Sequence, residues 1–173
     1  MILTDVILLL YCLLIAPKIA WERLRGKKHP AFFQRLGFFL PSSKGNPVIL
    51  LHAVSLGEVK SATSFYNLLK QQFPDASIFI TTTTVTGHEE AKRSLLGADA
   101  YLYLPLDFSF VVRRFLKKLK PNLFFLIEGD IWQNLITQIK KHGGKAFLIS
   151  GKMSQRLSLI HIYIYHYRRE LEM

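Results

Sequence analysis

The stretch PVILLHAVSLGE, residues 47–58, decides the fold. It is an apolar run, interrupted by one histidine, that leads into a small polar turn and a glutamate. Such a run is typical of a strand buried on both faces of a parallel sheet, and the residues after it are typical of a helix start. Turns that follow parallel strands lie along one edge of the sheet, where ligands bind. Ser55, Gly57 and Glu58 are therefore candidate site residues.

The same pattern recurs in NLFFLIEGDIW, residues 122–132, which places Glu128 and Asp130 directly after a second apolar run. Acids that follow two neighbouring strands share one cleft. The alternative is that Glu58 only stabilises a helix N-terminus, where a negative charge is favourable. In that case Glu128 and Asp130 are solvated turn residues. The residues alone leave both interpretations open.

Strands and helices alternate regularly along the main part of the chain. We expect strands at 48–54, 77–82, 100–104, 123–127 and 146–149, and helices at 58–72, 86–96, 110–119 and 131–141. Short apolar strands between helices favour an α/β fold with a doubly wound parallel sheet. In the common strand order 3-2-1-4-5 the first and fourth strands are neighbours, which would bring Glu58 near Glu128 and Asp130.

Other polar residues carry weaker signals. The run of threonines at residues 81–84 contains Thr83 and Thr84, whose hydroxyls suit a polyol ligand, although β-propensity and turn chemistry explain the run more simply. Thr86 and Glu89 have the spacing of a capping box. His52 is expected to face the core, and His88 to face solvent in the first turn of a helix. No dinucleotide fingerprint, P-loop or cysteine-based metal site is present in the sequence.

The N-terminus predicts a membrane anchor. Residues 6–16 are apolar apart from Tyr11, which is shorter than the ~20 residues that a spanning helix needs. In a cleaved signal peptide, basic residues precede the apolar run. Here the basic residues follow it. This order favours an uncleaved anchor with the main domain on the cytoplasmic face of the membrane.

The net charge of +11 raises the question of an anionic partner. Residues 17–45 contain seven basic residues and one acid, and such a cluster gains about 1 kcal/mol per basic residue near an anionic membrane surface. Residues 46–156 contain fourteen basic residues and eight acids and lack any nucleic-acid-binding motif, so nucleic acid is not an expected partner. The four phenylalanines of residues 32–39 either lie in the lipid headgroup region or pack on the main domain.

Four motifs occur in a fixed order: HAVSLGE at 52–58, TTTTVTG at 81–87, LPLD at 104–107 and EGDIW at 128–132. Together they resemble the N-terminal half of the Kdo transferases, which attach 3-deoxy-manno-octulosonic acid (Kdo) to lipid A. The apolar N-terminus and the Arg-Leu-Gly at 35–37 also match. The resemblance covers residues 1 to about 156. The EGDIW motif and the GKMS at 151–154 look most like the chlamydial branch.

The resemblance implies a membrane-associated GT-B glycosyltransferase with a Rossmann-like N-terminal domain, working without a metal or cofactor at the inner membrane. Its donor would be CMP-Kdo and its acceptor a lipid A precursor. Glu58 falls on the family's general base, a role worth roughly 10²–10⁴-fold in rate. Ser55, Gly57, Thr83, Thr84, Glu128 and Asp130 fall on positions expected to bind substrate. The chain departs from the family pattern at Asp130, commonly Glu, and at Gln133, commonly Pro.

The resemblance also divides the chain. Residues 1–45 form the anchor and a basic, aromatic juxtamembrane segment, and residues 46–156 form the acceptor-binding domain. Residues 157–173 leave the family pattern and read either as an artificial extension or as a genuine aromatic tail. The family's donor-binding domain is absent, so we expect a truncated half that is inactive alone. The alternative function is a membrane-tethered binding module without catalysis.

Overall fold

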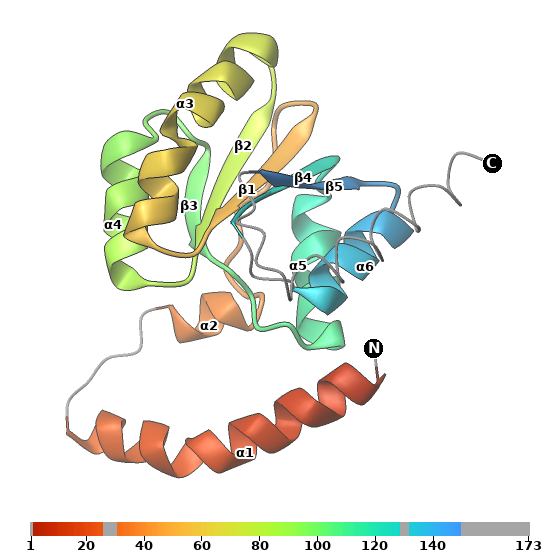
Figure 1. The fold of residues 1–173 in the computed structure, drawn as a ribbon. Helices are drawn as coiled ribbons and strands as arrows, with labels where there is room; N and C mark the ends of the chain where they lie inside the picture. Colours follow the sequence, from red (N-terminus) through yellow and green to blue (C-terminus); the bar gives the residue numbers. More distant parts are fainter. Residues whose placement is uncertain (1, 26–30, 129–131, 150–173) are drawn as a thin grey trace, which may run out of the picture.

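The computed structural model describes residues 2–25, 31–128 and 132–149. Its centre is a parallel sheet with the strand order β3-β2-β1-β4-β5, which confirms the expected doubly wound topology (Figure 1). The strands are β1 Val48–Ala53, β2 Ser77–Thr82, β3 Ala100–Tyr103, β4 Leu123–Ile127 and β5 Lys145–Ile149.

Helices cover both faces of this sheet. Helices α3 and α4 lie on one face and α5 and α6 on the other, while α1 and α2 lie at the edge where the strands end (Figure 1). The helices are α1 Ile2–Leu24, α2 Phe32–Arg35, α3 Leu56–Gln72, α4 Val85–Ser94, α5 Ser109–Leu119 and α6 Gln133–Lys141.

The core has two halves because successive side chains of a strand point to opposite faces. Leu50 and Phe124 pack toward α5 and α6, whereas the adjacent Leu51 and Phe125 pack toward α3 and α4. All residues of β1 and β2 are buried. This double burial explains why these strands are continuous apolar runs in the sequence.

The register aligns the ends of the central strands. Ala53 of β1 pairs with Ile127 of β4, and His52 pairs with Thr81 of β2. The turns that follow β1 and β4 therefore begin at the same level of the sheet. This pairing places Glu58 and Glu128 on turns that leave neighbouring strands, as the predicted strand order requires.

The expected helix starts differ from the observed ones by up to two residues. Helix α4 begins at Val85, and the hydroxyl of Thr84 caps it by accepting a hydrogen bond of 3.1 Å from the Gly87 amide. The predicted capping box of Thr86 and Glu89 is therefore wrong. The observed cap lies two residues earlier because the chain turns directly after β2.

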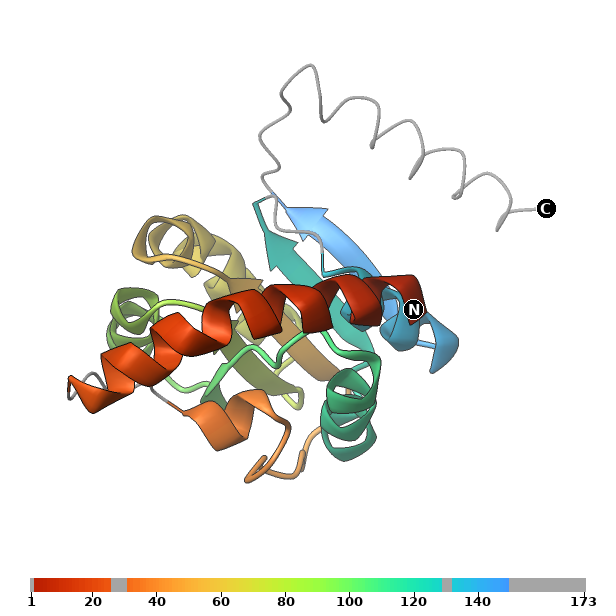
Figure 2. The ribbon, with the colours of Figure 1, turned by 90° about the horizontal axis from the view of Figure 1, so that it is seen from below.

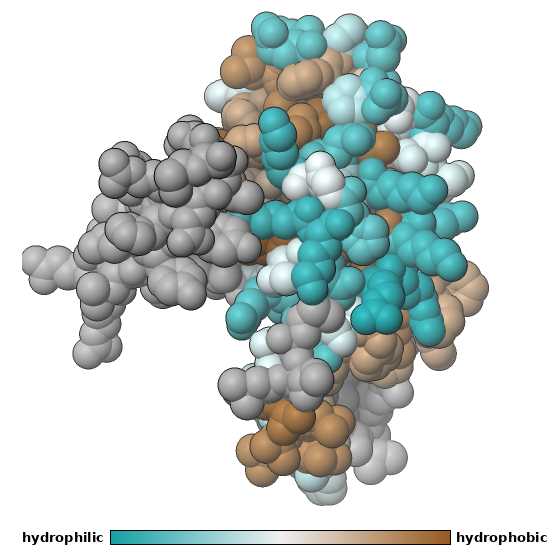
Figure 3. Space-filling model, turned by 90° about the vertical axis from the view of Figure 1, so that its right-hand side faces the viewer, coloured by the Kyte–Doolittle hydropathy of each residue, from teal (hydrophilic) through white to brown (hydrophobic). Residues whose placement is uncertain are grey.

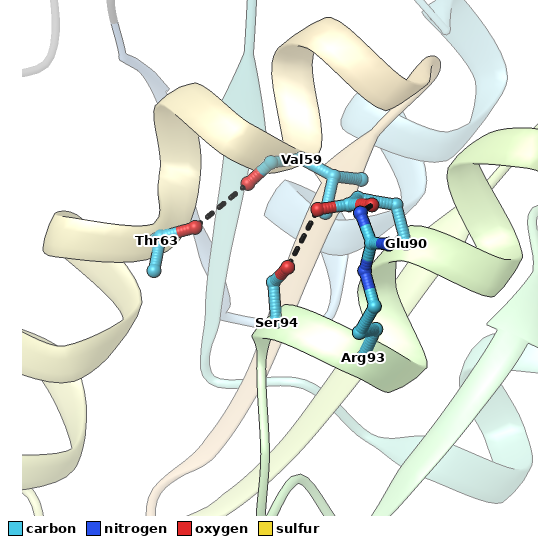
Figure 4. Close-up of polar contacts among 5 residues, drawn as sticks. All are labelled: Val59, Thr63, Glu90, Arg93 and Ser94. Carbon is cyan, nitrogen blue, oxygen red and sulfur yellow. Dashed lines mark hydrogen bonds and ion pairs between the residues drawn. The ribbon is translucent and has the colours of Figure 1, made fainter.

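Helices α3 and α4 pack around a buried carboxylate (Figure 4). Glu90 is only 4% exposed and accepts hydrogen bonds from Ser94, at 2.6 Å, and from Arg93. The Ser94 hydroxyl, together with Arg93, lowers the pKa of Glu90 against the effect of burial. These bonds satisfy an acid that would otherwise be unfavourable between two helices.

Helix α1 runs beneath the carboxyl edge of the sheet and contacts the domain near its N-terminus (Figures 1 and 2). Asp5 accepts hydrogen bonds from the amide and the hydroxyl of Ser109, at the start of α5. Many apolar side chains of α1 stay exposed, among them Leu13 and Leu14. Within the described ranges, no helix is both long and apolar enough to cross a membrane.

Candidate functional site

The turn after β1 contains three of the predicted site residues. Ser55 is the N-cap of α3, and Glu58 lies three positions later. One carboxylate oxygen of Glu58 accepts a hydrogen bond of 2.7 Å from the Val54 amide, and the other accepts one of 3.0 Å from the Ser55 hydroxyl. Both oxygens of Glu58 are thus engaged by groups that precede the first turn of α3. Its role as a general base stays a prediction.

Gly57 and Gly87 have opposite surroundings at this edge. A Cβ on Gly57 would meet nothing within 4 Å, and the residue is exposed. A Cβ on Gly87 would lie 2.9 Å from the Thr84 hydroxyl and 3.1 Å from both Ser55 C and Val54 O. Gly87 therefore allows the start of α4 to approach the β1–α3 turn, whereas the space beside Gly57 is open.

The threonine run divides into structural positions and one unpaired hydroxyl. Thr81 and Thr82 are buried in β2. Thr84 caps α4 and also donates to the Val54 carbonyl at 3.1 Å, so turn chemistry accounts for its hydroxyl. The Thr83 hydroxyl is buried and has no hydrogen-bond partner within the described residues. Of the two threonines predicted to bind substrate, Thr83 is the one with a free hydroxyl.

The turn after β4 is described only in part. Glu128 has a left-handed backbone with a φ of 58°, which is uncommon for a residue other than glycine. Its amide donates to the Ile149 carbonyl at 3.1 Å, so the turn starts beside β5. Asp130, also predicted to bind substrate, lies outside the described residues. The structure therefore brings Glu128 to the same sheet edge as Glu58. The substrate-binding role of Asp130 stays a prediction.

A cluster that the sequence analysis missed lies at the ends of β2 and β3. The Arg35 side chain of α2 donates to the Thr83 carbonyl, and its guanidinium lies 5.0 Å from the centre of the Tyr103 ring. The His88 ring stacks on Tyr103 at 4.3 Å, and its Nδ1 is 3.2 Å from the Thr82 hydroxyl. His88 is therefore half-buried, with its ring stacked on Tyr103, instead of fully solvated as predicted.

Burial in this cluster lowers the pKa of two of its members, His88 and Arg35. Burial, together with the nearby Lys92, lowers the pKa of His88 to about 4, so the ring is neutral at pH 7. Burial also lowers the pKa of Arg35. The signal in the sequence was the Arg-Leu-Gly motif, whose arginine ties α2 to the end of β2. The sequence gives no indication that Tyr103 contacts both Arg35 and His88.

Two aspartates hold the helix starts on the opposite face of the sheet. Asp107 accepts hydrogen bonds from the amides of Asn134, at 3.0 Å, and Leu135, at 2.9 Å, and so caps α6 from a distant loop. Burial raises the pKa of Asp107 despite these bonds. Asp5 also accepts from the Asn134 side chain at 3.0 Å. The LPLD motif, which ends in Asp107, thus fixes the helix that follows the EGDIW turn.

In the part of the chain that the structure describes, no three His, Cys, Asp or Glu side chains are grouped closely enough to hold a metal ion.

Comparison with known proteins identifies similar sequences. A family model described as 3-Deoxy-D-manno-octulosonic-acid transferase (kdotransferase) matches residues 30–159. The 3-deoxy-D-manno-octulosonic acid transferase of Chlamydia trachomatis serovar D is 35% identical over 144 residues, which cover 81% of this chain and 33% of that protein. The transferase of the same name from Haemophilus influenzae is 36% identical over 134 residues, which cover 75% of this chain and 31% of that protein.

A third relative, the transferase of the same name from Chlamydia muridarum, is 34% identical over 157 residues, covering 88% of this chain and 36% of that protein. The chain thus spans about a third of the length of these relatives. Its identity to the chlamydial proteins and to the Haemophilus protein is nearly the same, so these values do not separate a chlamydial branch.

Proposed function

Since the chain belongs to the family of 3-deoxy-D-manno-octulosonic acid transferases, we propose that it forms the acceptor-binding half of an enzyme that transfers Kdo from CMP-Kdo to a lipid A precursor. One observation carries this proposal: the turns with Glu58 and Glu128 leave the paired strands β1 and β4 at the switch point of the sheet. By itself this half is expected to bind the acceptor without transferring Kdo, because the donor would bind a second domain.

The proposed chemistry is the transfer of a glycosyl group to a sugar hydroxyl. The acceptor oxygen forms a bond to the anomeric carbon of Kdo, the bond from that carbon to the phosphate oxygen of CMP breaks, and CMP leaves with the electron pair. The proton of the attacking hydroxyl passes to the Glu58 carboxylate. The Val54 amide and the Ser55 hydroxyl hold that carboxylate in a fixed orientation at the sheet edge.

A substitution that keeps the hydrogen bonds to Val54 and Ser55 separates the structural role of Glu58 from its role as a base. In Glu58→Gln, the amide oxygen still accepts from Val54 and the amide nitrogen donates to the Ser55 oxygen, so the helix start is retained. In the complete enzyme we expect turnover to fall by ~10²-fold or more, because the base is lost. Stability and acceptor binding, measured by urea denaturation and by titration with the lipid, should change little.

Two further variants serve as controls. Glu58→Ala removes both the base and the hydrogen bonds from Val54 and Ser55, so it should also lose about 1 kcal/mol of stability. Glu128→Gln tests the other acid at this edge. Near-normal turnover in Glu58→Gln, combined with complete loss in Glu128→Gln, would show that the base lies on the turn after β4.

We also propose that α1 holds the domain on the cytoplasmic face of the inner membrane. The apolar side chains of α1 include several that are more than half exposed: Ile7, Leu9, Leu10, Tyr11, Leu13, Leu14 and Trp21. Figure 3 shows apolar surface at the base of the molecule, below the hydrophilic face of α5 and α6. An exposed apolar helix next to basic residues suits a helix lying in the interface of an anionic membrane.

The segment after α1 supports the same placement. Phe33 and Phe39 are 61% and 85% exposed, and their rings are 6.5 Å apart. Phe38 stands beside them, with the Arg114 guanidinium 4.2 Å from its ring centre. Exposed aromatic rings next to a cation suit the headgroup region of a membrane.

A second candidate is a membrane-tethered module that binds the lipid without catalysis. It is favoured by the engagement of both Glu58 oxygens at the helix start, which needs no chemical role for this acid. Incubation of the complete protein with CMP-Kdo and a lipid A precursor distinguishes the two functions. Lipid binding without any transfer of Kdo would support the module, whereas transfer would exclude it.

A further inference from the structure

His52 and Trp132 are in contact at the carboxyl edge of the sheet. Their rings are perpendicular, with an interplanar angle of 85° and a distance of 5.9 Å between ring centres. His52 is fully buried on β1, and Trp132 lies directly before α6. Nε2 of His52 and Nε1 of Trp132 are both buried and have no hydrogen-bond partner in the described part of the chain.

The hydrogen-bonding roles of these two nitrogens follow from their surroundings. Nδ1 of His52 is 3.0 Å from both the carbonyl and the hydroxyl oxygen of Thr81. The carbonyl can only accept and the hydroxyl donates to the Leu51 carbonyl at 3.4 Å, so Nδ1 carries the proton. Burial lowers the pKa of His52 to about 4, so the ring is neutral at pH 7 and Nε2 has a free lone pair. The indole Nε1 of Trp132 is only a donor. The two unpaired atoms are therefore an acceptor and a donor.

We propose that His52 and Trp132 form a binding site for one hydroxyl oxygen, which accepts a hydrogen bond from Trp132 Nε1 and donates one to His52 Nε2. A single O–H group satisfies both buried nitrogens, whereas either one left unpaired is unfavourable. This hydroxyl links His52 on β1, before the Ser55 turn, to Trp132, the last residue of the EGDIW motif. The site thus fixes the positions of the two acidic turns relative to each other.

Two sources of the hydroxyl group are compatible with this chemistry. One is a resident water molecule, since buried waters commonly bridge polar groups that lack other partners. The other is a hydroxyl of the acceptor sugar, and only this second source rests on the proposed function. The site itself would remain if Kdo transfer were disproved, because the pairing of His52 with Thr81 does not depend on it.

The test is nuclear magnetic resonance of the full 173-residue chain, which contains two tryptophans. Trp21 is 57% exposed and provides an internal reference. We expect the nitrogen shifts of His52 to show the neutral tautomer protonated at Nδ1, and the Trp132 indole proton to exchange more slowly than that of Trp21. A cross-peak between this proton and a long-lived water identifies water as the source.

Without such a cross-peak, the Trp132 indole signal should shift when a lipid A precursor is added in detergent micelles, which identifies the ligand hydroxyl. His52→Asn keeps a donor for the Thr81 carbonyl but removes Nε2, so exchange of the Trp132 indole proton should accelerate about tenfold. Trp21→Phe assigns the signals and should leave the remaining indole unchanged.

Three outcomes would overturn the proposal: a His52 tautomer protonated at Nε2, a direct scalar coupling between Trp132 Nε1 and His52 Nε2, or an indole signal that responds to neither water nor lipid. The first two are read from the unaltered chain, so they remain informative if His52→Asn fails to fold. The tautomer and the water contact are measured without CMP-Kdo, so their failure is distinct from failure of the proposed transfer.

Discussion

Gly57 and Gly87 have different surroundings, although both lie at the starts of neighbouring helices. Gly57→Ala adds a methyl group to open space in the first turn of α3, so stability should stay equal or rise by up to about 1 kcal/mol. Gly87→Ala forces the methyl group against Thr84, Ser55 and Val54, which should cost about 1–3 kcal/mol. Urea denaturation of the two variants measures the difference.

The glycine pair also tests the predicted ligand role of Gly57. If the open space beside Gly57 receives the acceptor, Gly57→Ala should weaken lipid binding while the fold gains or keeps its stability. Equal destabilisation by both substitutions would contradict the observed surroundings of these glycines.

Two histidines make the stability of the fold depend on pH. Burial lowers the pKa of His52 and His88 to about 4, from an ordinary value of 6.5. The unfolded chain therefore binds protons first as the pH falls, and stability is lost between pH 6.5 and 4. The fully buried His52 should account for about 3 kcal/mol of this loss, and the partly solvated His88 for less.

The measurement is the free energy of unfolding at pH 7 and pH 5, for the unaltered chain and for His88→Gln. The variant should lose less stability between these values, because one of the two titrating groups is gone. Identical losses in the two proteins would show that His88 keeps an ordinary pKa in the fold.

The predictability of single residues depended on where their partners lie. His52 was correctly expected in the core, because its own strand is apolar on both sides. The stacking of His88 was not expected, because His88 lies on α4 and its partner Tyr103 lies on β3. The side chain of Arg35 reaches Thr83 in the same way, across a large separation in sequence. A pattern of neighbouring residues contains no information about such contacts.

At the scale of elements, the strands were predicted well and the helix starts less well. The ranges expected for β2 and β4 agree with the observed ones, because a continuous apolar run has clear ends. Helix starts depend on caps, and α6 is capped by Asp107 from a loop that lies before α5. Residues 6–16 proved to be only the middle of α1, which extends from Ile2 to Leu24.

The Asp5 carboxylate joins α1 to the starts of α5 and α6. Burial raises the pKa of Asp5, but its hydrogen bonds with Ser109 and Asn134 outweigh this effect and lower it. Asp5→Ala removes the acceptor for the Ser109 amide, so hydrogen exchange at that amide should accelerate about tenfold. Asp5→Asn keeps an acceptor oxygen and should change exchange less. Equal exchange in all three proteins would show that Asp5 does not cap α5 in solution.

At the scale of the whole molecule, apolar surface and the predicted site meet at one edge of the sheet. Helix α1 lies beneath the carboxyl ends of the strands, where the turns with Ser55 and Glu128 begin (Figure 2). An acceptor whose acyl chains stay in the membrane could present its sugar to this edge without leaving the lipid. The strand order predicted this edge, whereas the position of α1 against it required the structure, because the hydrogen bonds of Thr4 and Asp5 to Gln133, Ser109 and Asn134 join residues far apart in sequence.

Membrane binding by α1 is testable with two matched leucines. Leu14 on α1 is 81% exposed and Leu68 on α3 is 50% exposed, so a glutamate at either position should leave the fold intact. Leu14→Glu places a charge in the surface proposed to enter the membrane and should weaken binding to vesicles of anionic lipid at least tenfold, on the order of 1.4 kcal/mol. Leu68→Glu adds the same charge on α3 and should reduce binding only slightly. Sedimentation with vesicles measures both, and equal binding of the two variants would show that another surface, such as the phenylalanines after α1, holds the chain on the lipid.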